Sequence, residues 1–330
     1  MNLSFDVTAL GNAIVDVIAP AQETFLADEN LAKGAMTLID EGGAARLYAR
    51  MAPGIEASGG SAANTVAGIA SLGGRAAFIG KVATDALGEV FAHDIRAIGA
   101  RFETPPLAGG PATARCLVNV TPDGQRTMCT FLGASTQLTP ADVSAPLIEG
   151  AAVVYLEGYL FDAPQARRAF AKAAALAHGA GRAIALTLCD PFVVERHGEA
   201  LRGFIESQVD ILFANEAEIT ALFRASDFEA AARAISSCVS IAALTRGADG
   251  SVVIGMGERR SIAAAAVDKV VDTTGAGDQY AAGFLFALAR GAPLDTCGRL
   301  GSAAASEVIS HYGPRPQTSL RALATGMIEQ

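Results

Sequence analysis

The segment with the clearest chemical meaning is residues 270–284, VVDTTGAGDQYAAGF. Gly275, Ala276 and Gly277 stand directly before an apolar pattern that is typical of a helix. Small residues at a helix start let a ligand approach the backbone, and the free N–H groups there bind anions. Asp278 comes next, where a carboxylate can accept the proton of an attacking hydroxyl. The segment therefore predicts a site for phosphoryl transfer, with Asp278 as the general base and the three small residues as the anion hole.

A purely structural alternative exists for this segment, a helix start with Asp278 as its N-cap. The length of the string and the apolar helix after it favour the chemical interpretation. The sequence contains no GxxxxGK[ST], no GxGxxG after the first apolar run, and no HRD or DFG. Phosphate binding must then use the glycine-rich turn, and a dinucleotide-dependent oxidoreductase is disfavoured.

The composition is that of a well-packed globular protein. Of the 330 residues, 51% are hydrophobic and 18% are charged. The net charge of −9 gives no basic footprint for nucleic acid, so we exclude that partner. The first residues, MNLSFDVTAL, lack a signal-peptide pattern, and no apolar run reaches the ~20 residues that span a bilayer. The five cysteines and four histidines are scattered, which predicts a cytoplasmic protein with reduced thiols, no zinc site and no membrane contact.

Short apolar runs that alternate with helical patterns must position the glycine-rich segment. The strand-like runs are residues 5–10, 76–79, 153–156, 183–188, 211–213, 241–244 and 251–254. Helical spacing is clear at residues 165–177 and 229–235. This alternation predicts a three-layer α/β fold with a mostly parallel central sheet and the site at the carboxyl ends of its strands.

Two stretches, about 19–57 and 106–131, interrupt this alternation. Residues 115–120 and 125–131 read as a hairpin around the turn TPDG at 121–124. The two stretches are predicted to pair as a small β-sheet lid within a single domain over residues 1–330. We expect this lid to close over the substrates and exclude water.

The string DTTGAGD resembles the C-terminal signature of the PfkB family, the ribokinase-like sugar and nucleoside kinases. Three further matches follow the order of that family: GGSAAN at 59–64 with LGG at 72–74, NEAE at 215–218, and TRGADG at 245–250. The matches cover nearly the whole chain. The resemblance implies a ribokinase-like fold and the transfer of phosphate from ATP, with Mg²⁺, to a hydroxyl group of a small molecule.

The resemblance also assigns roles to single residues. For the phosphate acceptor it implies Asn12, Asp16, Gly59, Gly60, Asn64 and Arg126, and for the nucleotide Asn215, Thr245, Gly247 and Gly250. It implies that Asn215 and Glu218 organise Mg²⁺ through water. It places Asp272 at a site for a monovalent cation such as K⁺. A carboxylate at Asp16 suits a vicinal diol, because it accepts two hydrogen bonds.

Structural alternatives stay open for some of these residues. Asp16 also fits a turn or strand end. Asn215 and Glu218 have the spacing of a capping box. Arg126 also fits a solvated surface position.

Within the family, GNAIVD at 11–16 and YLEGYL at 155–160 resemble the adenosine kinase branch. That branch phosphorylates the primary 5′-hydroxyl of a ribonucleoside, which here predicts conversion of adenosine to AMP. A sugar kinase similar to ribokinase, fructokinase or 2-keto-3-deoxygluconate kinase is the alternative, and a regulator that has lost catalysis is a third. Tyr159, Phe161 and Phe192 are candidates for stacking on a base. A monomer and a homodimer are both open.

Overall fold

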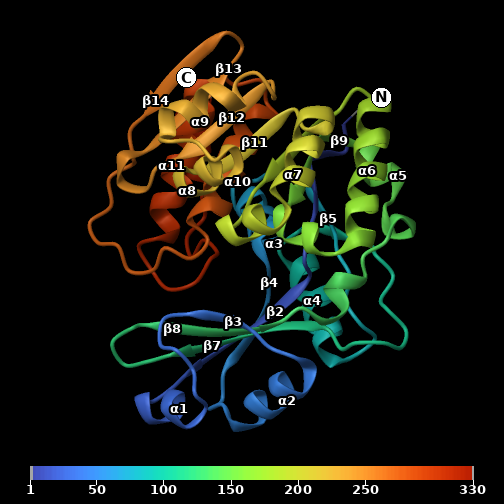
Figure 1. Ribbon diagram of the computed structural model, residues 1–330, viewed down its shortest axis with the longest axis vertical. Helices are drawn as coiled ribbons and strands as arrows, with labels where there is room; N and C mark the ends of the chain where they lie inside the picture. Colours follow the sequence, from blue (N-terminus) through green and yellow to red (C-terminus); the bar gives the residue numbers. More distant parts are fainter. Residues whose placement is uncertain (1–2, 329–330) are drawn as a thin grey trace.

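The computed structural model describes residues 3–328, which form two β-sheets with helices around them (Figure 1). The larger sheet has nine strands in the order β14 (Glu258–Ile262), β13 (Ser251–Gly255), β12 (Ile241–Thr245), β11 (Ile211–Asn215), β10 (Ala183–Thr187), β9 (Ala151–Glu157), β1 (Phe5–Leu10), β5 (Ala76–Ile79) and β6 (Arg101–Phe102). The strands from β12 to β6 are parallel, whereas β13 and β14 are antiparallel additions at one edge.

The large sheet is buried on both faces because its strands are apolar on both sides. Val153 and Tyr155 of β9 face one apolar cluster, and Val154 and Leu156 face the other. The first face is covered by α3 (Ser61–Ser71), α4 (Ala86–Ala97), α10 (Ala276–Leu288), α11 (Leu294–Val308) and α12 (Arg321–Ile328). The second is covered by α5 (Ala145–Glu149), α6 (Pro164–Gly179), α7 (Pro191–Gln208), α8 (Glu216–Phe223) and α9 (Phe228–Ile235). The result is the three-layer α/β arrangement that the sequence predicts.

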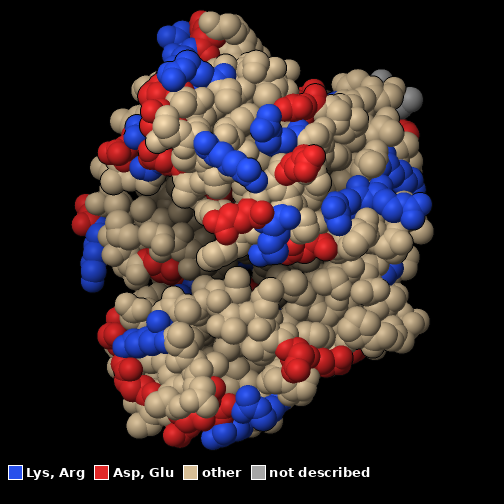
Figure 2. Space-filling view, viewed as in Figure 1, with Lys and Arg blue, Asp and Glu red and all other residues tan. Residues whose placement is uncertain are grey.

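The smaller sheet has five strands in the order β3 (Met36–Leu38), β8 (Arg126–Phe131), β7 (Ala114–Val120), β2 (Ile14–Pro20) and β4 (Ile55–Gly59). α2 (Glu41–Arg50) packs on β7 and β8 of this sheet, and α1 (Glu23–Asp28) follows β2; both helices lie at the bottom of Figure 1. Space-filling Figure 2 shows a hollow between the part with the large sheet and the part with the small one, with charges of both signs at its rim. The other short turns are 3-10 helices at Gly133–Gln137, Pro140–Asp142, Gly158–Asp162 and Gly247–Asp249.

The predicted strands are confirmed with shifts of one or two residues at their ends, as is the hairpin of β7 and β8. The sequence did not indicate the edge strand β14, whose residues are exposed except for Ile262. The smaller sheet also begins earlier than residue 19, because β2 starts at Ile14 and pairs with both β4 and β7. Among residues 3–328 we find no helix that combines the length and apolar character of a membrane span.

Candidate active site

The glycine-rich segment starts α10 beside the carboxyl ends of the parallel strands. Gly275 is the N-cap residue and has a left-handed backbone, with φ of 80°. A Cβ there would lie 2.6 Å from backbone atoms of Pro314, so both the conformation and the space require glycine. The Ala276 N–H donates to the Thr273 carbonyl at 3.2 Å. The following N–H groups of the first turn, beginning at Gly277, have no intrahelical acceptor and remain suited to an anion.

Asp278 is held by two side chains from the first turn of α3. Ser61 Oγ donates to Asp278 Oδ1 at 2.6 Å, and Asn64 Nδ2 donates to Oδ2 at 3.2 Å. Ser61 and Asn64 are three residues apart on a helix, so their side chains lie on the same face. Burial raises the pKa of Asp278 to about 6, although both hydrogen bonds oppose this shift. The group is therefore a carboxylate at neutral pH that takes up a proton readily.

Asp16 lies in the middle of β2 and approaches the same site from the smaller sheet. Burial raises its pKa to about 6, the positive charges of Arg315 and Arg126 oppose this, and the charge of Asp278 adds to it. Gly59 of the neighbouring strand leaves the space that the Asp16 carboxyl group fills. Asp16, packed on Gly59 in the smaller sheet, is thus near enough to Asp278 at the start of α10 for the two charges to interact.

Asn12 and Gly60 stand at the points where the chain leaves β1 and enters α3. Gly60 has φ of 98°, and a Cβ there would press on the Asn12 carbonyl oxygen. Asn12 is buried, and its Nδ2 donates to Glu157 Oε1 at 2.6 Å. Glu157 Oε2 accepts the Ala62 N–H at 2.9 Å. Burial raises the pKa of Glu157 to about 7, which these hydrogen bonds oppose. Glu157 thus ties the ends of β1 and β9 to the start of α3.

The residues expected to bind the nucleotide follow the neighbouring strands β11 and β12. Asn215 pairs with Thr245 in the parallel register, so both strand ends lie side by side. Gly247 and Gly250, with φ of 57° and 82°, form the turn into β13. A Cβ on Gly250 would strike the backbone of β14, so this turn also needs a glycine.

Asn215 and Glu218 form a capping box at the start of α8. The Asn215 N–H donates to Glu218 Oε2 at 2.9 Å, and the Glu218 N–H donates to Asn215 Oδ1 at 2.9 Å. Burial raises the pKa of Glu218 to about 7. No group of three or more His, Cys, Asp or Glu side chains among residues 3–328 is placed to hold a metal ion. Both Glu218 oxygens already accept hydrogen bonds from Asn215, so a contact of Glu218 with Mg²⁺ through water stays a prediction.

Asp272 and Arg126 form an ion pair between the segment before α10 and the small sheet. Arg126 Nη1 lies 2.5 Å from Asp272 Oδ2, and both side chains are less than 10% exposed. Asp272 Oδ1 accepts the Thr274 N–H and hydroxyl, and Oδ2 accepts the Gly313 N–H. Burial favours the neutral acid, but these hydrogen bonds and Arg126 hold the pKa of Asp272 below its usual range. The expected K⁺ site at Asp272 does not fit this arrangement, because Arg126 would have to leave first.

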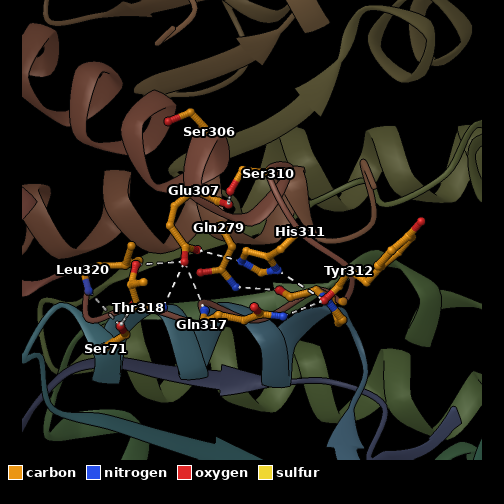
Figure 3. Close-up of polar contacts among 12 residues, drawn as sticks. Ser71, Gln279, Ser306, Glu307, Ser310, His311, Tyr312, Gln317, Thr318 and Leu320 are labelled. Carbon is orange, nitrogen blue, oxygen red and sulfur yellow. Dashed lines mark hydrogen bonds and ion pairs between the residues drawn. The ribbon is translucent and has the colours of Figure 1, made fainter. Parts of the chain in front are cut away.

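Three side chains at the site were not indicated by the sequence: Ser61, Glu157 and Arg315. Glu157 carries a weak signal, since it is a carboxylate at the end of an otherwise apolar strand. Arg315 lies on the loop between α11 and α12, where Nε donates to Asn64 Oδ1 at 3.3 Å. The loop is held by the Glu307 carboxylate, which accepts from the backbone N–H groups of Gln317 and Thr318 (Figure 3).

The aromatic candidates for base stacking have different surroundings. Phe161 is buried against Phe204. Tyr159 is directed to the Cys189 carbonyl at 3.4 Å, and Phe192 at the start of α7 is 66% exposed. Their roles stay predictions.

The fold and this site define the class of the protein: it is a phosphotransferase with an alcohol group as acceptor. The sequence profile of the pfkB family carbohydrate kinases matches residues 55–320. The chain belongs to this family.

The relatives include adenosine kinases and sugar kinases. The crystal structure of adenosine kinase from Sinorhizobium meliloti is 49% identical, with a TM-score of 0.89 over 98% of this chain and 99% of that one. A probable sugar kinase from Rhizobium etli is 47% identical, with a TM-score of 0.90 over 98% of both chains. Adenosine kinase of Saccharomyces cerevisiae is 27% identical over 93% of this chain and 96% of its own length. The match to an uncharacterized sugar kinase of Archaeoglobus fulgidus spans only 42% of that protein.

Proposed function

We propose that this protein is an ATP-dependent kinase that phosphorylates the primary 5′-hydroxyl of a ribonucleoside, with adenosine as the favoured acceptor. The observation that carries the proposal is the position of Asp278, which lies at the start of α10, held by Ser61 and Asn64, and interacts electrostatically with Asp16. The likeness to adenosine kinase of Sinorhizobium meliloti over 98% of the chain supports adenosine.

Each residue has a distinct task in this proposal. Asp16 accepts hydrogen bonds from the two ribose hydroxyls and orients the sugar, with Asn12, Gly59, Gly60 and Asn64 as its neighbours. Asp278 removes the proton of the 5′-hydroxyl as that oxygen attacks the γ-phosphorus of ATP, and ADP leaves as the bond from the γ-phosphorus to the β–γ bridging oxygen breaks. The N–H groups of Gly275 and Gly277 stabilise the charge on the transferred phosphoryl group, and that of Ala276 joins them when its hydrogen bond to the Thr273 carbonyl opens.

The nucleotide is proposed to lie over the ends of β11 and β12. Thr245, Gly247 and Gly250 form its wall, and Asn215 with Glu218 supports the hydrated Mg²⁺. When bound, Mg²⁺ supplies positive charge to the phosphate oxygens. Arg126 also faces this region and reaches the phosphates only when its ion pair with Asp272 opens. The free thiols of all five cysteines fit a reducing compartment, so we place the reaction in the cytoplasm.

A sugar kinase is the second candidate. The Rhizobium etli structure, described as a probable sugar kinase, covers the chain as fully as the adenosine kinase does. Asp16 and Asp278 serve a free sugar equally well, because both act on hydroxyl groups.

The test is ADP release from Mg²⁺-ATP with a panel of acceptors: adenosine, inosine, guanosine, ribose, fructose and 2-keto-3-deoxygluconate. We expect fast turnover with adenosine and little with the free sugars. Turnover only with a free sugar would overturn the nucleoside assignment while retaining the role of Asp278. No turnover with any acceptor would contradict both candidates.

A further inference from the structure

We infer that Arg315 is a positioning residue of the acceptor site, which orients the base Asp278 through Asn64 and places its positive charge beside Asp16. This inference rests on the function proposed above. None of the motifs that identify the family includes Arg315; its position in the folded chain carries the argument.

A chain of hydrogen bonds runs from Asp94 through Arg315 to the base. Arg315 Nη1 donates to Asp94 Oδ2 at 3.1 Å, and Arg315 Nε donates to Asn64 Oδ1 at 3.3 Å. Asn64 Nδ2 then donates to Asp278 Oδ2 at 3.2 Å. Because Arg315 occupies the oxygen of the Asn64 amide, the NH₂ group of that amide must point to Asp278.

Both ends of this series of hydrogen bonds, Asp94 and Asp278, are fixed by other contacts. Asp94 Oδ2 also accepts the Ser58 N–H at 2.8 Å, which anchors Arg315 to β4. Asp278 is held on its other oxygen by Ser61. The Asn64 amide connects these two fixed ends, and Arg315 sets its orientation.

The loop that carries Arg315 is itself braced from α11. Glu307 Oε1 accepts from the Gln317 N–H at 3.1 Å and from the Thr318 N–H and hydroxyl at 3.0 Å. Glu307 Oε2 lies 3.3 Å from His311 Nε2, as Figure 3 shows. Gln279, next to the base, donates to the Pro314 carbonyl at 3.0 Å. These contacts hold Arg315 from both sides of the loop.

The charge of Arg315 acts on Asp16. Three charged groups influence Asp16: Arg315 from the loop, Arg126 from β8 and Asp278 from α10. The thiol of Cys116 on β7 also lies near Asp16, whose charge adds to the burial that raises the pKa of that thiol. Among the charges that lower the pKa of Asp16 against burial, that of Arg315 is the largest. Only 19% of the Arg315 side chain is exposed, yet a guanidinium keeps its proton under such burial. Its Nη2 is buried without a hydrogen-bond partner among residues 3–328, so this N–H donor is left for a bound acceptor.

The first experiment compares Arg315→Gln and Arg315→Lys with the wild type in steady-state kinetics over a pH series. For Arg315→Gln we expect kcat/KM for the acceptor to fall about 10-fold or more, with the KM for ATP unchanged. We also expect the acidic limb of its kcat/KM–pH profile to move to higher pH, because loss of the positive charge raises the pKa of Asp16. Arg315→Lys keeps the positive charge but cannot bond Asp94 and Asn64 together. Its kcat should therefore fall, while the acidic limb of its pH profile should stay where it is in the wild type.

The matched control is Arg321→Gln, which makes the same chemical change at an exposed position at the start of α12. Its kinetics should equal those of the wild type. Wild-type behaviour of Arg315→Gln, or an equal loss in Arg321→Gln, would overturn the inference. If Arg315→Gln does not fold, Arg315→Lys and Asp94→Asn carry the test, because each changes one member of the hydrogen-bond series. A wild-type kcat in both variants would overturn the inference.

A second readout separates this inference from the proposed function. The side-chain carboxyl of Asp16 is titrated by ¹³C NMR in the wild type and in Arg315→Gln, with its signal assigned from Asp16→Asn. A higher pKa of Asp16 in Arg315→Gln supports the inference even if the wild type phosphorylates none of the acceptors, an outcome that removes only the proposed function. An unchanged pKa together with unchanged kcat/KM overturns the inference and leaves an active kinase in place.

Discussion

At the scale of single residues, two carboxyl groups from different parts of the chain lie near enough for their charges to interact. Asp16 and Asp278 each have a pKa of about 6, raised first of all by burial. Each group is useful only when ionised, Asp278 to take a proton and Asp16 to accept two hydrogen bonds. A pKa near 6 keeps both ionised at neutral pH, while it leaves Asp278 basic enough to act.

A pH profile tests this pairing. The pKa values of both groups in the folded protein lie above the ordinary aspartate value of 3.8, so each is half protonated at about pH 6 and activity is lost as the pH falls through that value. We expect kcat/KM for the acceptor to be level above about pH 7 and to fall by one to two powers of ten per pH unit well below pH 6. Circular dichroism over the same range controls for unfolding. A constant kcat/KM down to pH 5 in a folded enzyme would contradict the requirement that Asp16 and Asp278 be ionised.

The sequence indicated some site residues and missed others for a physical reason. Asp278 and Asn64 belong to the short strings DTTGAGD and GGSAAN. Each string forms the start of one helix, so its residue types and spacing can be interpreted without the rest of the fold. Ser61 and Glu157 lie inside the strings GGSAAN and YLEGYL, but their partners Asp278 and Ala62 are 217 and 95 residues away, so the strings do not show what these side chains contact. Arg315 lies in none of these strings, and only the fold brings it to Asn64, 251 residues away in the chain.

At the scale of elements, tight junctions between strands and helices place the side chains. Gly60 lies between β4 and α3, with φ of 98° and with the Asn12 carbonyl where a Cβ would stand. This junction fixes the direction in which α3 presents Ser61 and Asn64 to Asp278.

Replacing Gly60 by alanine therefore costs both stability and activity. We expect the free energy of unfolding to fall by at least about 1–2 kcal/mol from the left-handed backbone alone, with a further loss from the contact at Asn12. The control is Gly179→Ala at the exposed end of α6, where a Cβ meets no atom within 4 Å. It should be neutral or slightly stabilising. Urea unfolding of both variants measures the difference, and equal stabilities would refute the argument.

Strands were predictable from the sequence where nearly all of their residues are buried, and they were not where the residues are exposed. β9 to β12 have almost entirely buried residues, and their apolar runs identify them. β14 has a charged, exposed sequence and exists only because β13 offers it an edge. β2 was missed because its residues alternate between buried and partly buried positions, so it lacks the uniform burial of β9 to β12.

At the scale of the molecule, the chain crosses between its two sheets several times near the site. Residues 11–13 join β1 to β2, and Gly60 joins β4 to α3. The ion pair of Arg126 with Asp272 spans the same boundary. A small sheet connected in this way can move over the site without losing its attachment.

We predict that the small sheet closes when both substrates bind. Amide hydrogen exchange in residues 121–126, at the tip of the β7–β8 hairpin, should slow when adenosine and a non-hydrolysable ATP analogue are added together. Exchange in α6, on the far side of the large sheet, serves as the internal reference. Identical exchange at the hairpin with and without the ligands would count against closure.

The most direct test of the account is the turnover of Asp278→Asn with Mg²⁺-ATP and the preferred acceptor. The substitution keeps the size of the side chain but removes the base, so we expect kcat to fall by at least ~10²-fold while the KM for ATP changes little. Asp268→Asn, at an exposed position ten residues earlier, should match the wild type. A kcat for Asp278→Asn close to that of the wild type would contradict the central claim that Asp278 is the general base.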